Sequence, residues 1–236
     1  MPNRARTGLE SGAWFRSLAG VHMKILVTAF GPFGGRAQNA SSLALAGLKQ
    51  RLPRLNTRIL PVDSVIAPER MTRALRELEP DVVLMLGEAG GSAHIRLETT
   101  AWNELDFRIP DLAGRSPRGE RIVRDAPDSM ESTLPFAELH DVLSASGHRV
   151  AMSDDPGRYL CNQILFHALW SIGRRNLRMK AGFVHLPWEN DYPTERVVHA
   201  LEVAVSFMVR TGNIAAPSAG WRAARNGESG RRRSRY

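Results

Sequence analysis

Short apolar runs alternate with longer amphipathic segments along most of this chain, and this alternation restricts the fold more than any other feature. The run "MKILVTAF", which starts at Met23, is rich in apolar and β-branched residues and is followed by Gly and Pro, as in a buried strand that ends in a loop. Strands that alternate with helices are typical of a parallel sheet covered by helices on both faces. We therefore expect an α/β fold, a single three-layer α/β/α domain with a mostly parallel, twisted sheet.

The other expected elements follow from the same signals. Residues 94–103 alternate in polarity, so we expect one strand that carries Arg96 and Glu98 on the same face. Residues 104–133 are rich in Pro, Gly, Asp and Arg without a clear period, which predicts a long excursion with room for a hairpin. Further strands are predicted over 57–62, 81–91, 148–152 and 180–186, and helices over 39–52, 68–80, 135–146, 158–172 and 193–210.

Composition places the chain among globular proteins. It has 236 residues, of which 43% are hydrophobic, enough for a substantial core. Its one cysteine, Cys161, cannot form an internal disulfide or a CxxC pair, so we expect a reducing compartment, the cytoplasm. No apolar run approaches the roughly 18 residues of a membrane span, and the N-terminal segment lacks the apolar stretch of a secretory signal. We therefore expect no contact with a membrane.

The net charge of +8 lies mostly at the two ends of the chain. Residues 1–22 carry +2 and residues 213–236 carry +5, which leaves +1 for residues 23–212. The basic end is rich in Gly, Ser and Arg and has no apolar period. We expect a flexible N-terminal extension over 1–22, the α/β domain over 23–212 and a disordered tail over 213–236. A specific nucleic-acid site is not expected.

Cys161 lies where a turn at Pro156 and Gly157 passes into an amphipathic segment, so we expect it in the first turn of a helix. Free N–H groups and the positive end of the helix dipole favour a thiolate there and lower the pKa of the thiol. Asp154 and Asp155 oppose this effect, because nearby negative charge disfavours the thiolate. Two roles are therefore considered for this lone cysteine, a nucleophile and a small buried hydrophobic residue.

His185 and Glu98 are candidates for the base and the orienting carboxylate that a cysteine nucleophile needs. His185 lies at the end of an apolar strand, where open α/β sheets place their ligand sites. A structural histidine that is hydrogen-bonded at the strand end is the alternative. For Glu98, the alternative is a simple surface ion pair with Arg96.

Two glycine loops, "GPFGG" and "GEAGG", follow predicted strands. They lack the Lys and Ser/Thr of a P-loop and the full GxGxxG pattern of a dinucleotide site, and Asp63 is only a marginal match to the acidic ribose ligand. Both loops can instead form the walls of a small pocket. Phe30 and Phe33 flank the first loop, and two rings beside glycines suit a flat, uncharged ring ligand, although core packing is their commoner role.

In order and spacing, these segments resemble the pyroglutamyl peptidase I family of cysteine peptidases, from about residue 24 to 210. "VTAFGPFGG" resembles the family's VTGFxPFGG, "LGEAGG" its GxAGG loop, "LETTAWNELDFRIPD" its ExxAxN and ARIPD, "YLCN" its FVCN and "GFVHLP" its GFIHxP. The resemblance implies a cytoplasmic omega-peptidase that acts on peptides with N-terminal pyroglutamate and uses no metal or organic cofactor. Family members range from monomers to tetramers, and we expect a homo-oligomer.

The resemblance also implies the roles of individual residues. Cys161 matches the nucleophile that forms a thioester acyl-enzyme, His185 the base, and Glu98 the carboxylate that orients the base. Arg108 matches a loop arginine that would stabilise the oxyanion together with N–H groups at the start of the Cys161 helix.

Pocket residues are implied in the same way. Phe30 and Phe33 match two rings that sandwich the pyrrolidone, and Asn39 matches an asparagine that supports this region. Two positions depart from the family pattern, because Glu88 replaces a glutamine and Tyr159 a phenylalanine. The sequence "SDDPG" also replaces a neutral stretch before the nucleophile. Three alternatives therefore remain, namely a related cysteine amidohydrolase with an altered pocket, a catalytically silent binding protein and, least favoured, a nucleotide-binding protein.

Overall fold

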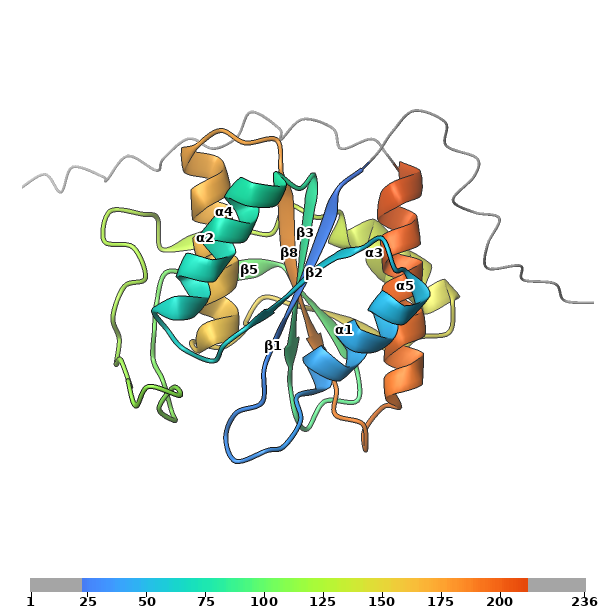
Figure 1. The fold of residues 1–236 in the computed structure, drawn as a ribbon, viewed down its shortest axis with the longest axis horizontal. Coiled ribbons are helices and arrows are strands. Elements are labelled where there is room, and N and C mark those ends of the chain that lie inside the picture. The colour runs from blue at the N-terminus through green and yellow to red at the C-terminus, as the bar shows by residue number, and fades with distance from the viewer. Residues whose placement is uncertain (1–22, 212–236) are drawn as a thin grey trace, which may run out of the picture.

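Strands and helices alternate, except over residues 82–131, along the part of the chain that the computed structural model describes, residues 23–211 (Figure 1). The extension predicted over 1–22 and the tail predicted over 213–236 lie outside the described residues. The strands are β1 (Ile25–Phe30), β2 (Asn56–Leu60), β3 (Val82–Glu88), β4 (Ile95–Glu98), β5 (Thr100–Trp102), β6 (Ser129–Glu131), β7 (Val150–Ser153) and β8 (Lys180–Leu186). The helices are α1 (Ala40–Arg51), α2 (Ile66–Leu78), α3 (Phe136–Ala145), α4 (Leu160–Arg174) and α5 (Thr194–Thr211).

Six strands form the main sheet in the order β2-β1-β3-β8-β4-β7. Four of its five pairings are parallel, so the prediction of a mostly parallel sheet is confirmed. The exception is the antiparallel pairing of β4 with β8. Only residues 89–94 separate β3 from β4, and a parallel return would need a crossover of about a dozen residues or more. The chain therefore reverses direction at this point.

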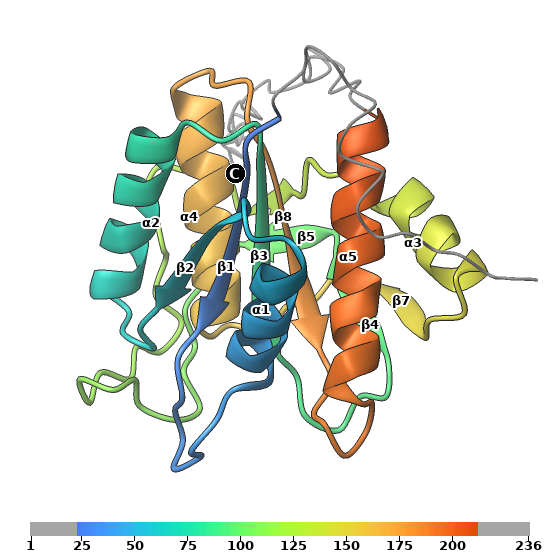
Figure 2. The same cartoon turned by 45° about the vertical axis from the view of Figure 1, so that its right-hand side comes forward.

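The two faces of the sheet carry separate halves of the core, because successive strand residues point to opposite faces. Ile25 and Val27 of β1 pack with residues of α1, α3 and α5, whereas Leu26 and Phe30 pack with residues of α2 and α4. Figure 2 shows the sheet between these two groups of helices. The predicted three-layer arrangement is confirmed. No helix among residues 23–211 has both the length and the hydropathy that crossing a membrane requires.

The single strand predicted over 94–103 is wrong, because the chain leaves the main sheet at Thr99. β4 belongs to the main sheet, whereas β5 pairs with β6 in a separate two-stranded ribbon. The N–H of Thr99 donates to the carbonyl of Ser153 at 2.7 Å, and the N–H of Ser132 donates to the carbonyl of Thr99 at 2.8 Å. Thr99 is thus held between two different neighbours, and the strand direction changes there.

The excursion predicted over 104–133 is present, but it contains little regular structure. Leu105 and Glu120 form an isolated antiparallel bridge, and the N–H of Phe107 donates to the carbonyl of Pro117 at 2.9 Å, so the expected hairpin is present in irregular form. The segment is nevertheless packed against the body of the protein. Phe107 is fully buried, and the Asp111 carboxylate accepts hydrogen bonds from the N–H and Oγ of Ser64 at 2.9 and 2.7 Å.

Candidate active site

The register of three neighbouring strands brings together the side chains predicted as base and carboxylate. β8 pairs with β3 on one side and with β4 on the other, so His185 lies between Gly87 and Arg96. Glu98 follows Arg96 by two residues and therefore projects from the same face of the sheet. This face is covered by α4, which carries Cys161 in its first turn, as predicted.

Glu98 and His185 form a buried, hydrogen-bonded pair. Glu98 Oε1 lies 2.7 Å from His185 Nδ1, and the exposed fractions of the two residues are 0% and 4%. An ionised carboxylate can only accept hydrogen bonds, so Nδ1 carries the proton and donates it. Nε2 is then the ring nitrogen that can take up a proton. Glu98 is not part of a surface ion pair, although Arg96 Nε lies 3.4 Å from its Oε1.

Gly87 belongs to this site and is absent from the residues predicted for it. A Cβ atom at this position would lie 2.9 Å from Cys161 Sγ and 2.6 Å from Phe183 Cζ. The thiol therefore lies directly over the backbone of β3, and only glycine leaves room for it there. His185 pairs with Gly87 on the neighbouring strand, about 4.8 Å away, so the imidazole projects from the strand position next to the one that the thiol covers. Gly87 is the first glycine of "GEAGG", and it lies within β3 rather than in the loop that follows.

The pKa of the Cys161 thiol is raised to about 12, first by burial and then by the carboxylates of Glu98 and Glu88. Arg96 and the backbone N–H of Cys161 act in the opposite direction. The prediction of a lowered pKa is therefore wrong, because burial and two carboxylates outweigh the partial charge at a helix N-terminus. The carboxylates that oppose the thiolate come from the sheet, rather than from the two aspartates that precede the helix.

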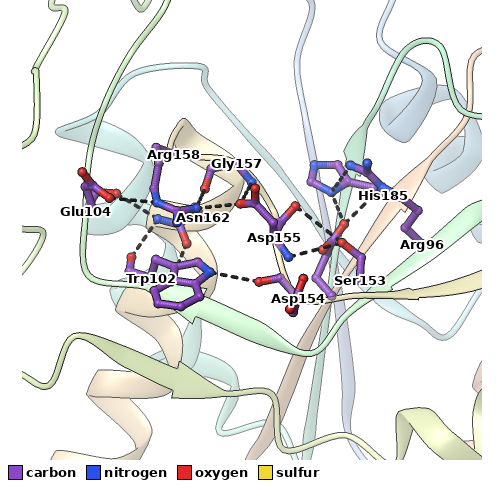
Figure 3. Close-up of polar contacts among 11 residues, drawn as sticks. Arg96, Trp102, Glu104, Ser153, Asp154, Asp155, Gly157, Arg158, Asn162 and His185 are labelled. Carbon is purple, nitrogen blue, oxygen red and sulfur yellow. Dashed lines mark hydrogen bonds and ion pairs between the residues drawn. The ribbon is translucent and has the colours of Figure 1, made fainter.

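Asn162, the residue after the nucleophile candidate, fixes the start of α4. Its Oδ1 accepts a hydrogen bond from the N–H of Trp102 at 2.7 Å, and its Nδ2 donates to the carbonyls of Trp102 and Glu104 at 2.7 and 2.9 Å. The side chain is fully buried, and Figure 3 shows it between these two partners. One buried amide thus joins the first turn of α4 to β5 and to the residues that follow it. The motif "YLCN" contains this residue, which is also absent from the predicted site.

The turn before Cys161 is held by Arg158 (Figure 3). Its Nε donates to Glu104 Oε2 at 3.0 Å, its Nη1 donates to Asp155 Oδ1 at 2.6 Å, and its guanidinium lies 5.0 Å from the ring centroid of Trp102. Asp155 Oδ1 also accepts a hydrogen bond from the N–H of Gly157, whose φ of 79° suits glycine. Arg158, which follows the acidic "SDDPG" stretch, therefore balances the charge of Asp155. Asp155 also fixes the turn through its hydrogen bond from Gly157.

Aromatic side chains gather next to the first turn of α4. Tyr159 contacts Phe33, with ring centroids 6.0 Å apart, and Phe107, at 4.4 Å. Tyr159 donates its hydroxyl hydrogen to the carbonyl of Pro110 at 3.2 Å, and burial raises the pKa of this hydroxyl to about 12. Phe30 lies in the core and forms no ring contact with Phe33 among residues 23–211. The partner of Phe33 in this structure is therefore Tyr159.

Glu88 is directed toward the start of α1. Its Oε2 accepts a hydrogen bond from the N–H of Ala40 at 2.8 Å, and its Oε1 lies 3.9 Å from Arg36 Nε. Asn39 is the N-cap of α1, and its Nδ2 donates to the carbonyl of Gly31 at 3.2 Å. A helix N-terminus and an arginine both favour a negative charge, so the site accommodates glutamate at this position. Glu88 and Asn39 together tie the loop after β1 to the end of β3.

Arg108 is the predicted site residue that stays apart. It is exposed, next to the buried Phe107, and it forms no hydrogen bond or ion pair within residues 23–211. The other predicted residues surround the thiol or hold the elements next to it. The central group consists of a thiol and an imidazole that a buried carboxylate orients, an arrangement that suits nucleophilic acyl transfer.

Comparison with known proteins shows similarity to one group of peptidases. A family model described as pyroglutamyl peptidase matches residues 23–224. Pyrrolidone-carboxylate peptidase 1 of Caldanaerobacter subterraneus is 32% identical over 80% of this chain and 98% of its own, and the Thermococcus onnurineus pyrrolidone-carboxylate peptidase is 35% identical over 80% and 100%.

Solved structures agree with this relationship. The pyrrolidone carboxyl peptidase of Thermococcus litoralis is 31% identical, with a TM-score of 0.75 over 80% of this chain and 94% of that one. The Pyrococcus furiosus pyrrolidone carboxyl peptidase is 30% identical, with a TM-score of 0.74 over 80% of this chain and all of that one. The motifs quoted above therefore reflect common descent, and the chain belongs to the pyroglutamyl peptidase family.

Proposed function

We propose that this protein is a cysteine peptidase that hydrolyses the amide bond after an N-terminal pyroglutamyl residue. The observation that carries the proposal is the thiol of Cys161 over Gly87, whose register partner His185 is hydrogen-bonded to the buried carboxylate of Glu98. Membership of the family and the names of the relatives support the substrate class.

Cys161 is the proposed nucleophile, and the raised pKa of its thiol shapes the first step. Because the resting thiol is neutral, His185 Nε2 takes its proton as Sγ attacks the pyroglutamyl carbonyl carbon. A C–S bond forms, and the carbonyl oxygen becomes an oxyanion. When this intermediate collapses, the imidazolium gives the proton to the leaving amine and the C–N bond breaks. Water, deprotonated by His185, then attacks the thioester, and the thiol leaves with that proton.

The oxyanion would form at the start of α4. This helix begins at Leu160, and no side chain caps its first N–H groups. Unpaired N–H groups at a helix N-terminus stabilise developing negative charge. Arg108 is a second proposed contributor, and its exposed side chain has no partner among the described residues that would hold it elsewhere.

The aromatic side chains beside Cys161 support a substrate with an uncharged ring. Phe33 and Tyr159 are the proposed walls of the pyrrolidone pocket, with Phe30 behind them in the core and Asn39 holding the loop that carries Phe33. The case for a different amide substrate rested on Glu88. The Glu88 carboxylate accepts a hydrogen bond from the first turn of α1 and lies near Arg36, so the exchange of glutamine for glutamate has a structural explanation. It therefore does not argue against the pyroglutamyl substrate.

The setting of the enzyme is also proposed. We infer a catalytic domain over 23–212 that works in the cytoplasm, because its only cysteine is a free thiol that the mechanism needs in reduced form. Self-association is supported by exposed apolar side chains on β2, at the start of α2 and in the 104–133 segment. These side chains are Ile59, Val65, Ile66, Ile109 and Leu112.

The test is release of a fluorescent amine from its pyroglutamyl amide under reducing conditions. Wild type should be active and Cys161→Ala should lose at least about 10³-fold in kcat/KM, as expected when a nucleophile is removed. The prolyl amide of the same amine is the control, because it keeps the ring size but lacks the lactam carbonyl. Glu88→Gln should keep the preference for the pyroglutamyl amide. Full activity of Cys161→Ala, or equal rates on the two amides, would contradict the proposal.

A further inference from the structure

Arg96 contacts both members of the Glu98–His185 pair. Its Nη2 lies 3.4 Å from His185 Nδ1 and its Nε lies 3.4 Å from Glu98 Oε1, and Figure 3 shows the guanidinium beside the imidazole. The antiparallel register of β4 and β8 places Arg96 directly opposite His185. Since Nδ1 already donates to Glu98, the guanidinium cannot donate to it as well. Arg96 therefore acts on the imidazole as a neighbouring positive charge.

Glu98 lacks the hydrogen bonds that usually stabilise a buried carboxylate. Its side chain is fully buried, its Oε1 accepts from His185, and its Oε2 has no hydrogen-bond partner within residues 23–211. A desolvated carboxylate with one hydrogen bond needs a positive charge nearby to stay ionised. Among the described residues, Arg96 is the permanently charged cation in contact with Glu98. The guanidinium is thus the positive charge that is placed to balance the Glu98 carboxylate.

The other groups around His185 do not supply this balance. Cys161 from α4 is neutral at rest, and Glu88 at the end of β3 adds negative charge that Arg36 balances only at 3.9 Å. β7, which pairs with β4, is formed by Val150–Ser153 and carries no charged side chain. Without Arg96, the immediate surroundings of the imidazole would be negative, and its protonated form would be favoured.

We propose that Arg96 is a positioning residue, whose guanidinium balances Glu98 so that His185 stays a neutral base and the thiolate of Cys161 is favoured as it forms. At rest, Arg96, Glu98 and His185 together carry no net charge. After His185 takes the thiol proton, the same three groups carry +1 and face the negative charge that develops at sulfur and on the oxyanion. The identity of the substrate rests on the proposed function, whereas the effect on the thiol does not depend on it.

The experiment compares wild type, Arg96→Gln and Arg96→Lys by two pH profiles, the rate of Cys161 alkylation by iodoacetamide and kcat/KM on the pyroglutamyl amide. Removal of a cation in contact shifts a neighbouring titration by about one pH unit or more. The acid limb of both profiles should therefore move to higher pH by about one unit in Arg96→Gln, which lowers the rate on that limb about tenfold. Arg96→Lys keeps the charge, so its limb should stay near that of wild type.

Arg58→Gln is the matched control. Arg58 is an exposed strand arginine on β2, and its side chain donates only to the carbonyl of Thr57 among the described residues, so both profiles should be unchanged. Arg96→Met is a second uncharged variant, which keeps the comparison possible if Arg96→Gln does not fold. Acid limbs that coincide in wild type and the uncharged variants would overturn the proposal, as would an equal shift in Arg96→Lys. If wild type leaves the pyroglutamyl amide intact while the alkylation limb still moves, the proposed substrate fails and the role of Arg96 stands.

Discussion

The burial that places the thiol of Cys161 beside His185 also keeps it protonated. The carboxylates of Glu98 and Glu88 raise the pKa of the thiol further, and Arg96 opposes them only in part. In the proposed mechanism, His185 therefore takes the thiol proton as the sulfur attacks. The proposed catalysis then depends on the relative orientation of Cys161 and His185, and hence on the residue of β3 that leaves space for the thiol.

That residue is Gly87, and its replacement by alanine should abolish most of the activity. The new Cβ would meet both Cys161 Sγ and Phe183 Cζ at less than 3 Å, so the thiol or the strand must move. A displacement of about 1 Å can cost about 10²-fold in rate, and we expect a loss of this order in kcat/KM on the pyroglutamyl amide. Gly173→Ala is the control, because a Cβ there meets only Met130 Cε, at 3.9 Å. Wild-type kinetics in Gly87→Ala would show that the site tolerates the shift.

Among the elements, α4 has the strictest placement. Its first turn carries Cys161, the proposed nucleophile, and three hydrogen bonds of Asn162 fix this turn relative to β5. The turn before it is fixed separately by Arg158. These polar contacts thus fix the N-terminal end of α4, where Cys161 lies. Packing of the apolar face alone would not fix this end.

Asn162→Ala should therefore reduce both stability and activity. It removes three buried hydrogen bonds and leaves backbone groups of Trp102 and Glu104 without partners, which costs about 2–3 kcal/mol in the free energy of unfolding. Urea denaturation measures this loss, and kcat/KM should fall with it. The comparison is Gln163→Ala, since the neighbouring amide donates one hydrogen bond, to the carbonyl of Ser64, and does not hold the nucleophile's turn. An equal loss of kcat/KM in the two variants would mean that Asn162 has no special part in positioning Cys161.

Element boundaries were predictable where local chemistry sets them. The strand predicted over 180–186 is β8 itself, and Pro156 and Gly157 marked the entry to α4. The end of β4 at Thr99 was not predictable, because polarity alternates through this residue although its backbone partners come from distant parts of the chain. The same limit applies to the site. Motifs identified Cys161 and His185, but the contact between Gly87 and the thiol exists only once α4 lies on the sheet.

At the scale of the whole molecule, the 104–133 segment joins the site to the far edge of the sheet. It carries Phe107, which packs against Tyr159, and it is anchored by Asp111 to the residues between β2 and α2. Arg115 adds ion pairs with Asp111 and Asp63 at 3.5 and 3.0 Å. The pocket wall therefore depends on a cluster of carboxylates that lies outside the catalytic group.

This dependence predicts a loss of stability in acid. Burial opposes the ionisation of Asp111, but hydrogen bonds from Ser64, Arg115 and Ala113 outweigh it and lower the pKa of the carboxyl from 3.8 to about 2. A pKa that is lowered in the folded state contributes stability above the unfolded pKa, and this contribution is lost as the pH falls from about 4 to about 2. The shift corresponds to about 2 kcal/mol.

Urea unfolding of wild type and Asp111→Asn across this range tests the prediction. The difference in the free energy of unfolding should be constant from pH 7 to about pH 5 and should shrink by about 2 kcal/mol as the pH falls to about 2, because protonation removes from wild type what the substitution has already removed. Asp125→Asn is the control, since Asp125 is exposed in the same segment and forms no hydrogen bond or ion pair among the described residues. Parallel curves for wild type and Asp111→Asn would show that the carboxylate does not anchor the segment. If the difference in the free energy of unfolding shrinks as predicted, protonation of Asp111 contributes to acid destabilisation through the same contact with Ser64 that supports the proposed pocket wall.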